Sequence, residues 1–395
     1  LSLLLIGFAP SSIAIGVFCA FSLRYFFLNK KKVTIRFDFG LLLPILLYLY
    51  FLSTYLWSVD IEQTFKGFER MIILALVPIT FCLIPKVSYR NYRIVLNIFT
   101  WGNAVFGILF ICSALYNFVK TQSISVFTYH DLVSILDLNA VYVTLIFSIS
   151  FFYLLSLKEK KIIKKVLLVF FLVLIILLSS KIIILVLLIG MLIFLFKRKV
   201  YSLNKKKIIT GILAIIIGIS ISSITLYERF RIEQNTKFSE ILNKKTFGKV
   251  YYWTGSSIRL FQLRILKEQI EEESIIFKGF GLFASKKNLE KRHKYYDTYH
   301  TFHSYNYHNQ YAQILSETGI IGLMILLIIL GFLIKKAIKS KDYNFIMFSI
   351  LIITIFFTES VLWRQRGLFL FTILYCLYLR VLFLEVTNDR GIDLK

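Results

Sequence analysis

The sequence predicts an all-α polytopic membrane protein with about 11–12 transmembrane helices and one large, partly helical external loop. Two observations predict this fold class. Hydrophobic residues make up 57% of the 395 residues, whereas soluble domains contain roughly 45–50%. These residues also occur in long runs, without the alternation of apolar and polar positions that marks a surface helix or strand.

Apolar runs of about 20 residues, the length that crosses a bilayer, define the candidate spans. The sequence begins with Leu inside such a run, so residues 1–8 are compatible with the end of an earlier span. We expect spans near residues 9–28, 39–57, 70–85, 94–117, 138–157, 162–180, 182–197, 208–226, 313–334, 345–362 and 367–385.

Basic residues orient these spans. The chain has 47 Lys and Arg against 22 Asp and Glu, a formal net charge of +25. The basic residues cluster in alternate short links, where positive charge marks the cytoplasmic side. We therefore attribute the charge to topology and to contact with anionic inner-membrane lipids, and we expect no nucleic-acid partner. The clusters contain Arg24, Lys30, Lys31, Lys32 and Arg36; Lys86, Arg90 and Arg93; Lys158, Lys160, Lys161, Lys164 and Lys165; Lys197 to Lys207; and Lys335, Lys336, Lys339 and Lys341.

This orientation divides the chain into four parts. Residues 1–226 carry the first transmembrane helices, 227–312 form one external loop, 313–385 carry the C-terminal transmembrane helices, and 386–395 form a cytoplasmic tail. Loops longer than roughly 15 residues without structure are uncommon and are usually functional. We therefore expect the functional site in the external loop.

The turn Ser179-Ser180-Lys181 places a cation at the outer membrane surface. Residues 162–197 have Lys-rich flanks on both sides, so they must cross the membrane twice, as two short helices. A Lys at this depth is costly unless it faces protein or water. Lys181 is therefore either an interfacial residue whose amine reaches the head groups or a ligand for an anionic head group.

Residues 256–268 have the pattern of an amphipathic helix, which we expect to lie on the membrane surface. Its cations at 264 and 267 each have a Glu four residues later, a spacing that favours ion pairs within a helix. Arg259 has no acidic neighbour at helical spacing and lies in the first turn, where free N–H groups favour an anion. Arg259 is thus either a solvated surface residue or the unpaired cation of a phosphate site.

A polar stripe follows, in which Asn309, Gln313 and Glu317 recur every four residues and lead into an apolar span. Such a stripe requires a wet or polar partner at the membrane. His308 precedes the stripe, and imidazole suits general-base catalysis at neutral pH. The alternative is a hydrogen-bonded structural histidine. Gly319 and Gly322 leave room for close helix packing.

The region before the stripe is rich in aromatic rings and imidazoles. Residues 295–307 contain many Tyr, and such rings suit either the faces of sugars or a mobile aromatic loop. The histidines at 293, 300, 303 and 308 match no zinc spacing, so we expect no metal and no cofactor. The cysteines at 19, 82, 112 and 376 lie in apolar segments, which argues against a disulfide in the loop.

These features resemble the O-antigen ligase and O-antigen polymerase superfamily, bacterial membrane glycan transferases with many spans and one large periplasmic loop late in the chain. The resemblance covers most of the chain and is most specific at Arg259 onward, at Gly279-Phe280-Gly281 and at His308 through Gly322. The segments 57–60 and 179–181 resemble family turns, with Lys181 in place of the usual Arg. Residues 359–367 resemble a variant segment of some members, and we assign them no role.

The resemblance implies an inverting, metal-independent transfer of an undecaprenyl-diphosphate-linked glycan to a sugar hydroxyl, at the periplasmic face of the bacterial inner membrane. Arg259 and His308 would be catalytic, the first stabilising the departing diphosphate and the second accepting or orienting the acceptor proton. The acceptor would be lipid A core for a ligase or another lipid-linked glycan for a polymerase. Residues expected to bind substrate are Lys181, Arg264, Asn309, Gln313 and Glu317.

Two other classes of protein remain open. A transporter would carry ionisable residues in mid-span, whereas Glu359 and Lys181 are nearly the only ones within these apolar runs. A scaffold protein would need neither an unpaired arginine nor a polar membrane stripe. Both features favour the enzyme.

Overall fold

The structure, a computed structural model, describes residues 1–29, 38–159, 161–197, 231, 233–234, 236–248 and 250–383. Within these ranges every regular element is a helix, and Val87 and Val381 form an isolated bridge. The predicted all-α fold class is confirmed. The predicted span 208–226 and the tail 386–395 lie outside the described residues.

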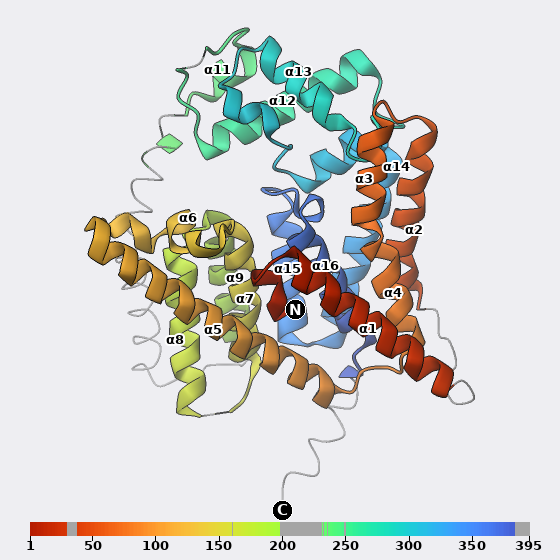
Figure 1. The fold of residues 1–395 in the computed structure, drawn as a ribbon, viewed down its shortest axis with the longest axis vertical. Coiled ribbons are helices and arrows are strands. Elements are labelled where there is room, and N and C mark those ends of the chain that lie inside the picture. The colour runs from red at the N-terminus through yellow and green to blue at the C-terminus, as the bar shows by residue number, and fades with distance from the viewer. Residues whose placement is uncertain are drawn as a thin grey trace, which may run out of the picture.

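The helices form a bundle with a polar cap above it (Figure 1). On one side of the bundle α2 packs against α4 and α14, and on the other α7 packs against α5 and α8; α15 contacts α7, α9 and α14 between them. The bundle helices are α1 (Phe8–Leu28), α2 (Phe39–Ser53), α3 (Ile61–Met71), α4 (Ile73–Leu83), α5 (Tyr89–Thr121), α7 (Ala140–Ser156), α8 (Ile162–Leu177), α9 (Lys181–Lys197), α14 (Gln310–Ser340), α15 (Tyr343–Ile355) and α16 (Gln365–Arg380). Short elements between them are η1 (Ser2–Leu5), η2 (Thr54–Leu56), η3 (Ile124–Phe127), α6 (Tyr129–Leu132), η4 (Ser134–Leu136) and η7 (Val361–Trp363).

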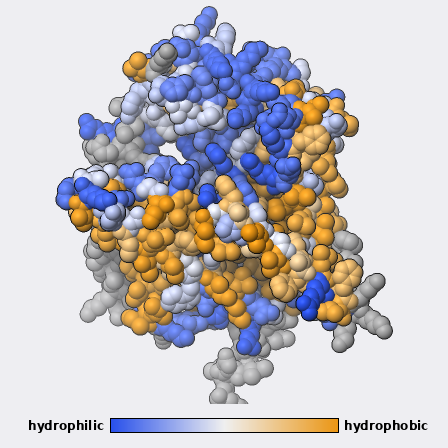
Figure 2. Space-filling view, in the orientation of Figure 1, coloured by the Kyte–Doolittle hydropathy of each residue, from blue (hydrophilic) through white to orange (hydrophobic). Residues whose placement is uncertain are grey.

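The bundle has the surface of an integral membrane protein. Four described segments are long and apolar enough to cross a bilayer, and further apolar helices are shorter. Figure 2 shows hydrophobic residues over the bundle and hydrophilic residues over the cap. The predicted total of about 11–12 spans stays a prediction. The four segments are Phe8–Leu28, Phe39–Leu56, Tyr89–Thr121 and Gln310–Ser340.

The predicted span 345–362 is wrong in its last third. Helix α15 ends at Ile355, and residues 356–364 form a connection to α16. The carbonyls of this connection accept hydrogen bonds from the start of α14, for example Phe356 O from Gln310 N at 2.7 Å. A helix continuing to 362 would keep these carbonyls for its own backbone.

The cap, which we define as the described residues between 236 and 309, has a hydrophobic core of its own. It contains α11 (Phe238–Asn243), α12 (Gly255–Glu273), α13 (Ser285–Tyr295) and η6 (His300–Ser304). The amphipathic helix predicted at 256–268 is confirmed as α12. Its expected position on the membrane surface is wrong, because its apolar residues Ile258, Phe261 and Ile265 are buried in the cap core.

Two glycines let the cap pack directly on α14. Gly279 and Gly319 both have φ +66, and a Cβ on either would clash with the backbone of the other segment. Gly319 breaks the helical geometry of α14. Three hydrogen bonds join the segments at this contact: Phe280 N to Ser316 O at 2.9 Å, Gly281 N to Glu317 O at 2.8 Å and Ile320 N to Ile276 O at 2.7 Å.

Candidate active site

Arg259 lies in the first turns of α12 and reaches the connection between α15 and α16. Its Nη2 is 2.9 Å from Oε1 of Glu359, and its Nε donates to the carbonyl of Thr358 at 3.0 Å. Nη1 donates to the carbonyl of Gly255 at 2.8 Å. The prediction that Arg259 is unpaired is therefore wrong, because its partner lies outside the helix whose neighbours the sequence reveals.

His308 stands immediately before α14 and faces the same carboxylate. Its Nδ1 is 3.4 Å from Oε2 of Glu359, and its ring lies against Tyr305. The backbone has φ 46, and its N–H donates to Asn306 Oδ1 at 2.9 Å. The side chain is 21% exposed, and Nε2 has no hydrogen-bond partner among the described residues. His308 thus has one ring nitrogen held by protein and one available to a substrate.

Glu359 joins the two residues that the sequence singled out. One carboxylate oxygen pairs with Arg259 and the other with His308, and the side chain is 8% exposed. Burial alone would raise the pKa of Glu359, but the hydrogen bond from His308 and the charge of Arg259 lower it overall. Glu359 is therefore an anion at neutral pH that orients the guanidinium of Arg259 and the imidazole of His308.

Lys181 begins α9 and lies near the start of α12, as the anion-site hypothesis requires. Its Nζ is 3.3 Å from Oε1 of Glu233, whose Oε2 accepts the N–H of Ser256 at 3.3 Å. Burial raises the pKa of Glu233, but the Ser256 hydrogen bond and the Lys181 charge lower it overall. The start of α12, where the sequence predicts a bound anion, thus binds the carboxylate of Glu233.

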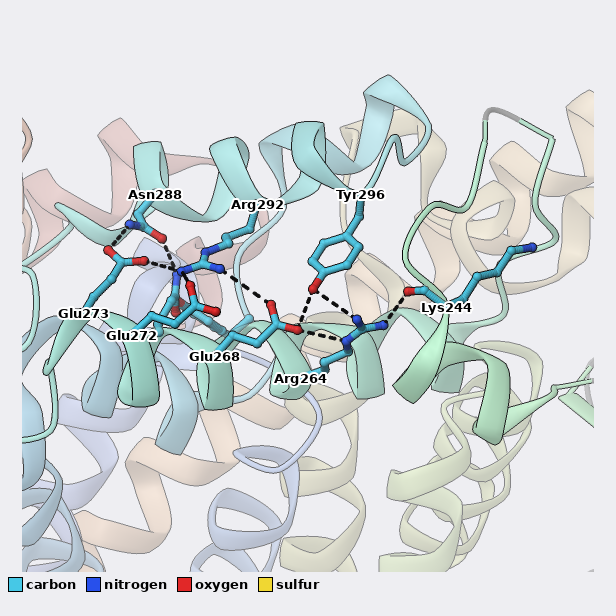
Figure 3. Close-up of polar contacts among 10 residues, drawn as sticks. Lys244, Arg264, Glu268, Glu272, Glu273, Asn288, Arg292 and Tyr296 are labelled. Carbon is cyan, nitrogen blue, oxygen red and sulfur yellow. Dashed lines mark hydrogen bonds and ion pairs between the residues drawn. The ribbon is translucent and has the colours of Figure 1, made fainter.

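Arg264 serves the structure of the cap. All its guanidinium nitrogens are engaged: Nε with Glu268 at 2.9 Å, Nη1 with the carbonyls of Ile241 and Lys244, and Nη2 with Tyr296 Oη at 3.0 Å. Figure 3 shows this network continuing along α12 to Arg292 of α13. The expectation that Arg264 binds substrate is not supported by these contacts.

The side chains of the polar stripe form hydrogen bonds within the protein. Gln313 Nε2 donates to Glu317 Oε1 at 2.6 Å and to Ser285 Oγ at 3.3 Å, and both stripe residues are buried. Asn309 caps α14 through Ala312 N and donates to the carbonyl of Phe357. These side chains hold the cap and the 356–364 connection on α14, and substrate binding by Asn309, Gln313 and Glu317 stays a prediction.

Residues 166–327 match the model of the O-antigen ligase family. This segment runs from α8 through the cap into α14 and includes Lys181, Arg259 and His308. The matched segment covers about two fifths of the chain. No curated protein matches the chain.

The match supports the resemblance to the O-antigen ligase and polymerase superfamily. It supports a glycosyltransferase-like activity of the ligase or polymerase type, and the apolar helices support an integral membrane protein. Glu359 lies beyond the matched segment, so Arg259 pairs with a carboxylate from the connection between α15 and α16.

The other histidines of the matched segment are structural or exposed. His293 is fully buried, with its two ring nitrogens facing Gln262 at 3.0 Å and Thr298 at 2.9 Å. Burial lowers the pKa of His293 to about 3. His303 Nε2 faces the carbonyl of Thr298 at 3.0 Å. In the described part of the chain, no three His, Cys, Asp or Glu side chains form a metal-binding group.

Sequence reasoning missed Glu359 and Glu233 as members of the site. Glu359 had a usable signal, since it is an acidic residue inside an apolar run, and such residues are retained in membranes only when paired or functional. Glu233 had no comparable signal, because it lies among many charged loop residues.

Proposed function

We propose that the protein transfers an undecaprenyl-diphosphate-linked glycan to a sugar hydroxyl on lipid A core, at the periplasmic face of the bacterial inner membrane. The observation that carries the proposal is the cluster of Arg259, Glu359 and His308, in which one carboxylate holds a cation and a candidate base together. The O-antigen ligase match supports the chemistry. The alternative with the same chemistry is a repeat-unit polymerase.

In the proposed reaction the acceptor oxygen forms a bond to the anomeric carbon as the bond from that carbon to the diphosphate oxygen breaks. His308 Nε2 takes the acceptor proton, while Glu359 at Nδ1 stabilises the imidazolium that forms. The bonding electrons leave with the undecaprenyl diphosphate. Attack opposite the leaving group inverts the anomeric configuration.

Arg259 and Lys181 stabilise the negative charge that grows on the departing diphosphate. Arg259 is 33% exposed at its side chain, so a phosphate oxygen reaches its guanidinium without unfolding the cap. At Lys181 the diphosphate takes the place of the Glu233 carboxylate. Two fixed cations perform the charge neutralisation for which other glycosyltransferases use a metal ion.

The proposal is tested by deleting the gene and separating surface glycans on a gel, with plasmids carrying wild type, His308→Ala or Arg259→Ala. We expect both variants to abolish glycan transfer at normal protein levels. Matched controls are His300→Ala, an exposed cap histidine, and Lys267→Ala, an exposed cation on the same helix as Arg259. Both controls should retain transfer.

The glycan pattern separates the outcomes. If long glycan is missing from lipid A core and accumulates on the lipid carrier, the protein is a ligase. If single repeat units remain attached to core, it is a polymerase. An unchanged ladder in the deletion strain contradicts glycan transfer altogether.

A further inference from the structure

A polar cavity lies at the end of the bundle that faces the cap, next to the cluster of Arg259, Glu359 and His308. Its volume is about 310 Å³, at the lower end of the roughly 300–1,000 Å³ of small-molecule sites. Every residue that lines it belongs to the bundle or its connections and none to the cap, so it is separate from Lys181 and the start of α12. Its polar lining consists of His130, Asp137, Asn139, Tyr142, Arg364 and Arg366.

The two arginines of this cavity have different environments. Arg366 Nε donates to the carbonyl of Leu4 at 3.0 Å, its guanidinium lies 4.7 Å from the ring centroid of Phe8, and Asp137 lies within electrostatic reach. Arg364 makes no side-chain hydrogen bond or ion pair with any described residue. Arg364 is therefore the uncompensated positive charge of the cavity.

The cavity adjoins the catalytic cluster through one segment of chain. The connection between α15 and α16 carries Glu359 in its middle and Arg364 at its end, with η7 between them. Tyr142 lines the cavity and lies within electrostatic reach of both Glu359 and Arg364. A group bound at Arg364 is thus close to the carboxylate that holds His308.

We propose that this cavity binds a phosphate-bearing group of the acceptor, with Arg364 as its charged contact. This inference rests on the proposed function, which places the donor diphosphate at Arg259 and Lys181 and leaves Arg364 without a role. A guanidinium binds phosphate oxygens through two parallel hydrogen bonds, and it does so best where no carboxylate competes. The phosphate belongs either to a phosphorylated lipid A core or to a second lipid-linked diphosphate.

The binding test uses the full chain in phosphatidylcholine nanodiscs, titrated with inorganic diphosphate in a calorimeter. We expect two binding sites in the wild type. Arg364→Met, which keeps the side-chain length without the charge, should weaken one site about 10- to 100-fold and leave the other unchanged. Arg259→Lys should affect only the other site, and Lys286→Ala, which removes an exposed cation of the cap, should affect neither.

Identical titrations of Arg364→Met and wild type would overturn the proposal. Arg364→Lys guards against a folding defect, because it keeps the charge and should retain most of the binding. If Arg364→Met and Arg364→Lys have the melting temperature of the wild type and neither changes the titration, Arg364 is not a phosphate ligand.

The cellular arm identifies the source of the phosphate. Arg364→Met should leave single repeat units if the acceptor is a second lipid-linked diphosphate. It should instead leave glycan on the lipid carrier if the acceptor is a phosphorylated core. In a host whose core lacks phosphate, Arg364→Met and wild type should then transfer glycan equally. Wild-type glycan with Arg364→Met contradicts the acceptor site, whereas wild-type glycan in the deletion strain contradicts the proposed function itself.

Discussion

Glu359 is the residue on which the geometry of the candidate site depends. It is nearly buried, yet it carries a charge, and its two oxygens contact Arg259 and His308. A carboxylate in this position fixes the tautomer of the histidine, because Nδ1 must donate the proton and Nε2 remains the base. Glu359 is therefore a positioning residue that acts through its neighbours.

We predict that Glu359→Gln lowers glycan transfer about 10- to 100-fold, the effect of removing a hydrogen bond to a charged group. Glu359→Asp keeps the carboxylate and should recover part of the activity. The measurement is initial transfer rate in membranes with matched protein amounts. The pKa of Glu359 lies below its ordinary value of 4.5. The contribution of its carboxylate to glycan transfer is therefore complete above pH 4.5 and is lost only as the pH falls through the lowered pKa. A fully active Gln variant at neutral pH would show that the charge is not needed.

His293 makes the stability of the cap sensitive to acid. It is neutral in the folded protein because burial lowers its pKa from 6.5 to about 3. The unfolded cap therefore binds more protons than the folded cap between these values, and stability falls as the pH drops through this window by about 1.4 kcal/mol per unit. The protection factors of α12 and α13, which correct hydrogen exchange for the pH dependence of its intrinsic rate, should fall between pH 7 and 5.

His293→Gln should flatten this pH dependence, because its side chain does not titrate. His300→Gln is the matched control, since that histidine is exposed, and it should keep the wild-type acid response. If the protection factors of α12 and α13 are equal at both pH values in the wild type, His293 is not the acid-sensitive group.

The sequence predicts ion pairs between neighbours on one helix, but it does not predict ion pairs between residues far apart in the chain. The pairs Arg264–Glu268 and Lys267–Glu271 were expected from helical spacing and form at 2.9 and 3.6 Å. The partner of Arg259 lies 100 residues away, and no periodicity connects them. Sequence reasoning therefore identified the catalytic candidates but could not predict that one carboxylate holds both.

At the scale of elements, the contact between the 277–281 turn and α14 decides whether the cap is placed correctly. We predict that Gly319→Ala strongly reduces the yield and thermal stability of folded protein. The added methyl would meet the backbone of Phe277, and φ +66 is strained for any residue with a Cβ. Melting in detergent and purification yield measure the effect.

Gly331→Ala is the matched control on the same helix. A Cβ at Gly331 meets nothing within 4 Å, and Ala favours helix over Gly by about 1 kcal/mol. This variant should be as stable as wild type or slightly more so. Equal melting temperatures for Gly319→Ala and Gly331→Ala would show that the backbone contact adjusts without cost.

Element boundaries were predicted where composition changes sharply and missed where tertiary contacts decide. Helices α2 and α7 match the predicted spans, because apolar runs end at turns there. Helix α15 ends early, since Gln310 at the start of α14 and Arg259 of the cap engage the carbonyls that would have continued it. The surface position of α12 was mispredicted for the same reason, because its apolar face is covered by the cap and not by lipid.

At the scale of the whole molecule, the short basic links between helices predict the orientation of the bundle in the membrane. Helix α14 runs from the cap to a last turn that carries Lys339. The start of α5 lies at this far end, because Tyr92 contacts Asp342 just after α14, and the neighbouring Arg93 pairs with Glu159 in the link before α8. The cap is also basic, but a long loop is translocated largely regardless of its charge, whereas short basic links stay in the cytoplasm. The cap and its site should therefore face the periplasm.

Cysteine labelling tests this orientation in a variant whose four native cysteines are replaced by serine or alanine. Lys286→Cys on the cap and Lys339→Cys at the far end of α14 are both at exposed positions. A membrane-impermeant maleimide should label Lys286→Cys in intact cells with a permeable outer membrane, and Lys339→Cys only after lysis. The reverse pattern would place the site in the cytoplasm, where an undecaprenyl-linked glycan is assembled but not transferred to core, and the proposed reaction would fail with it.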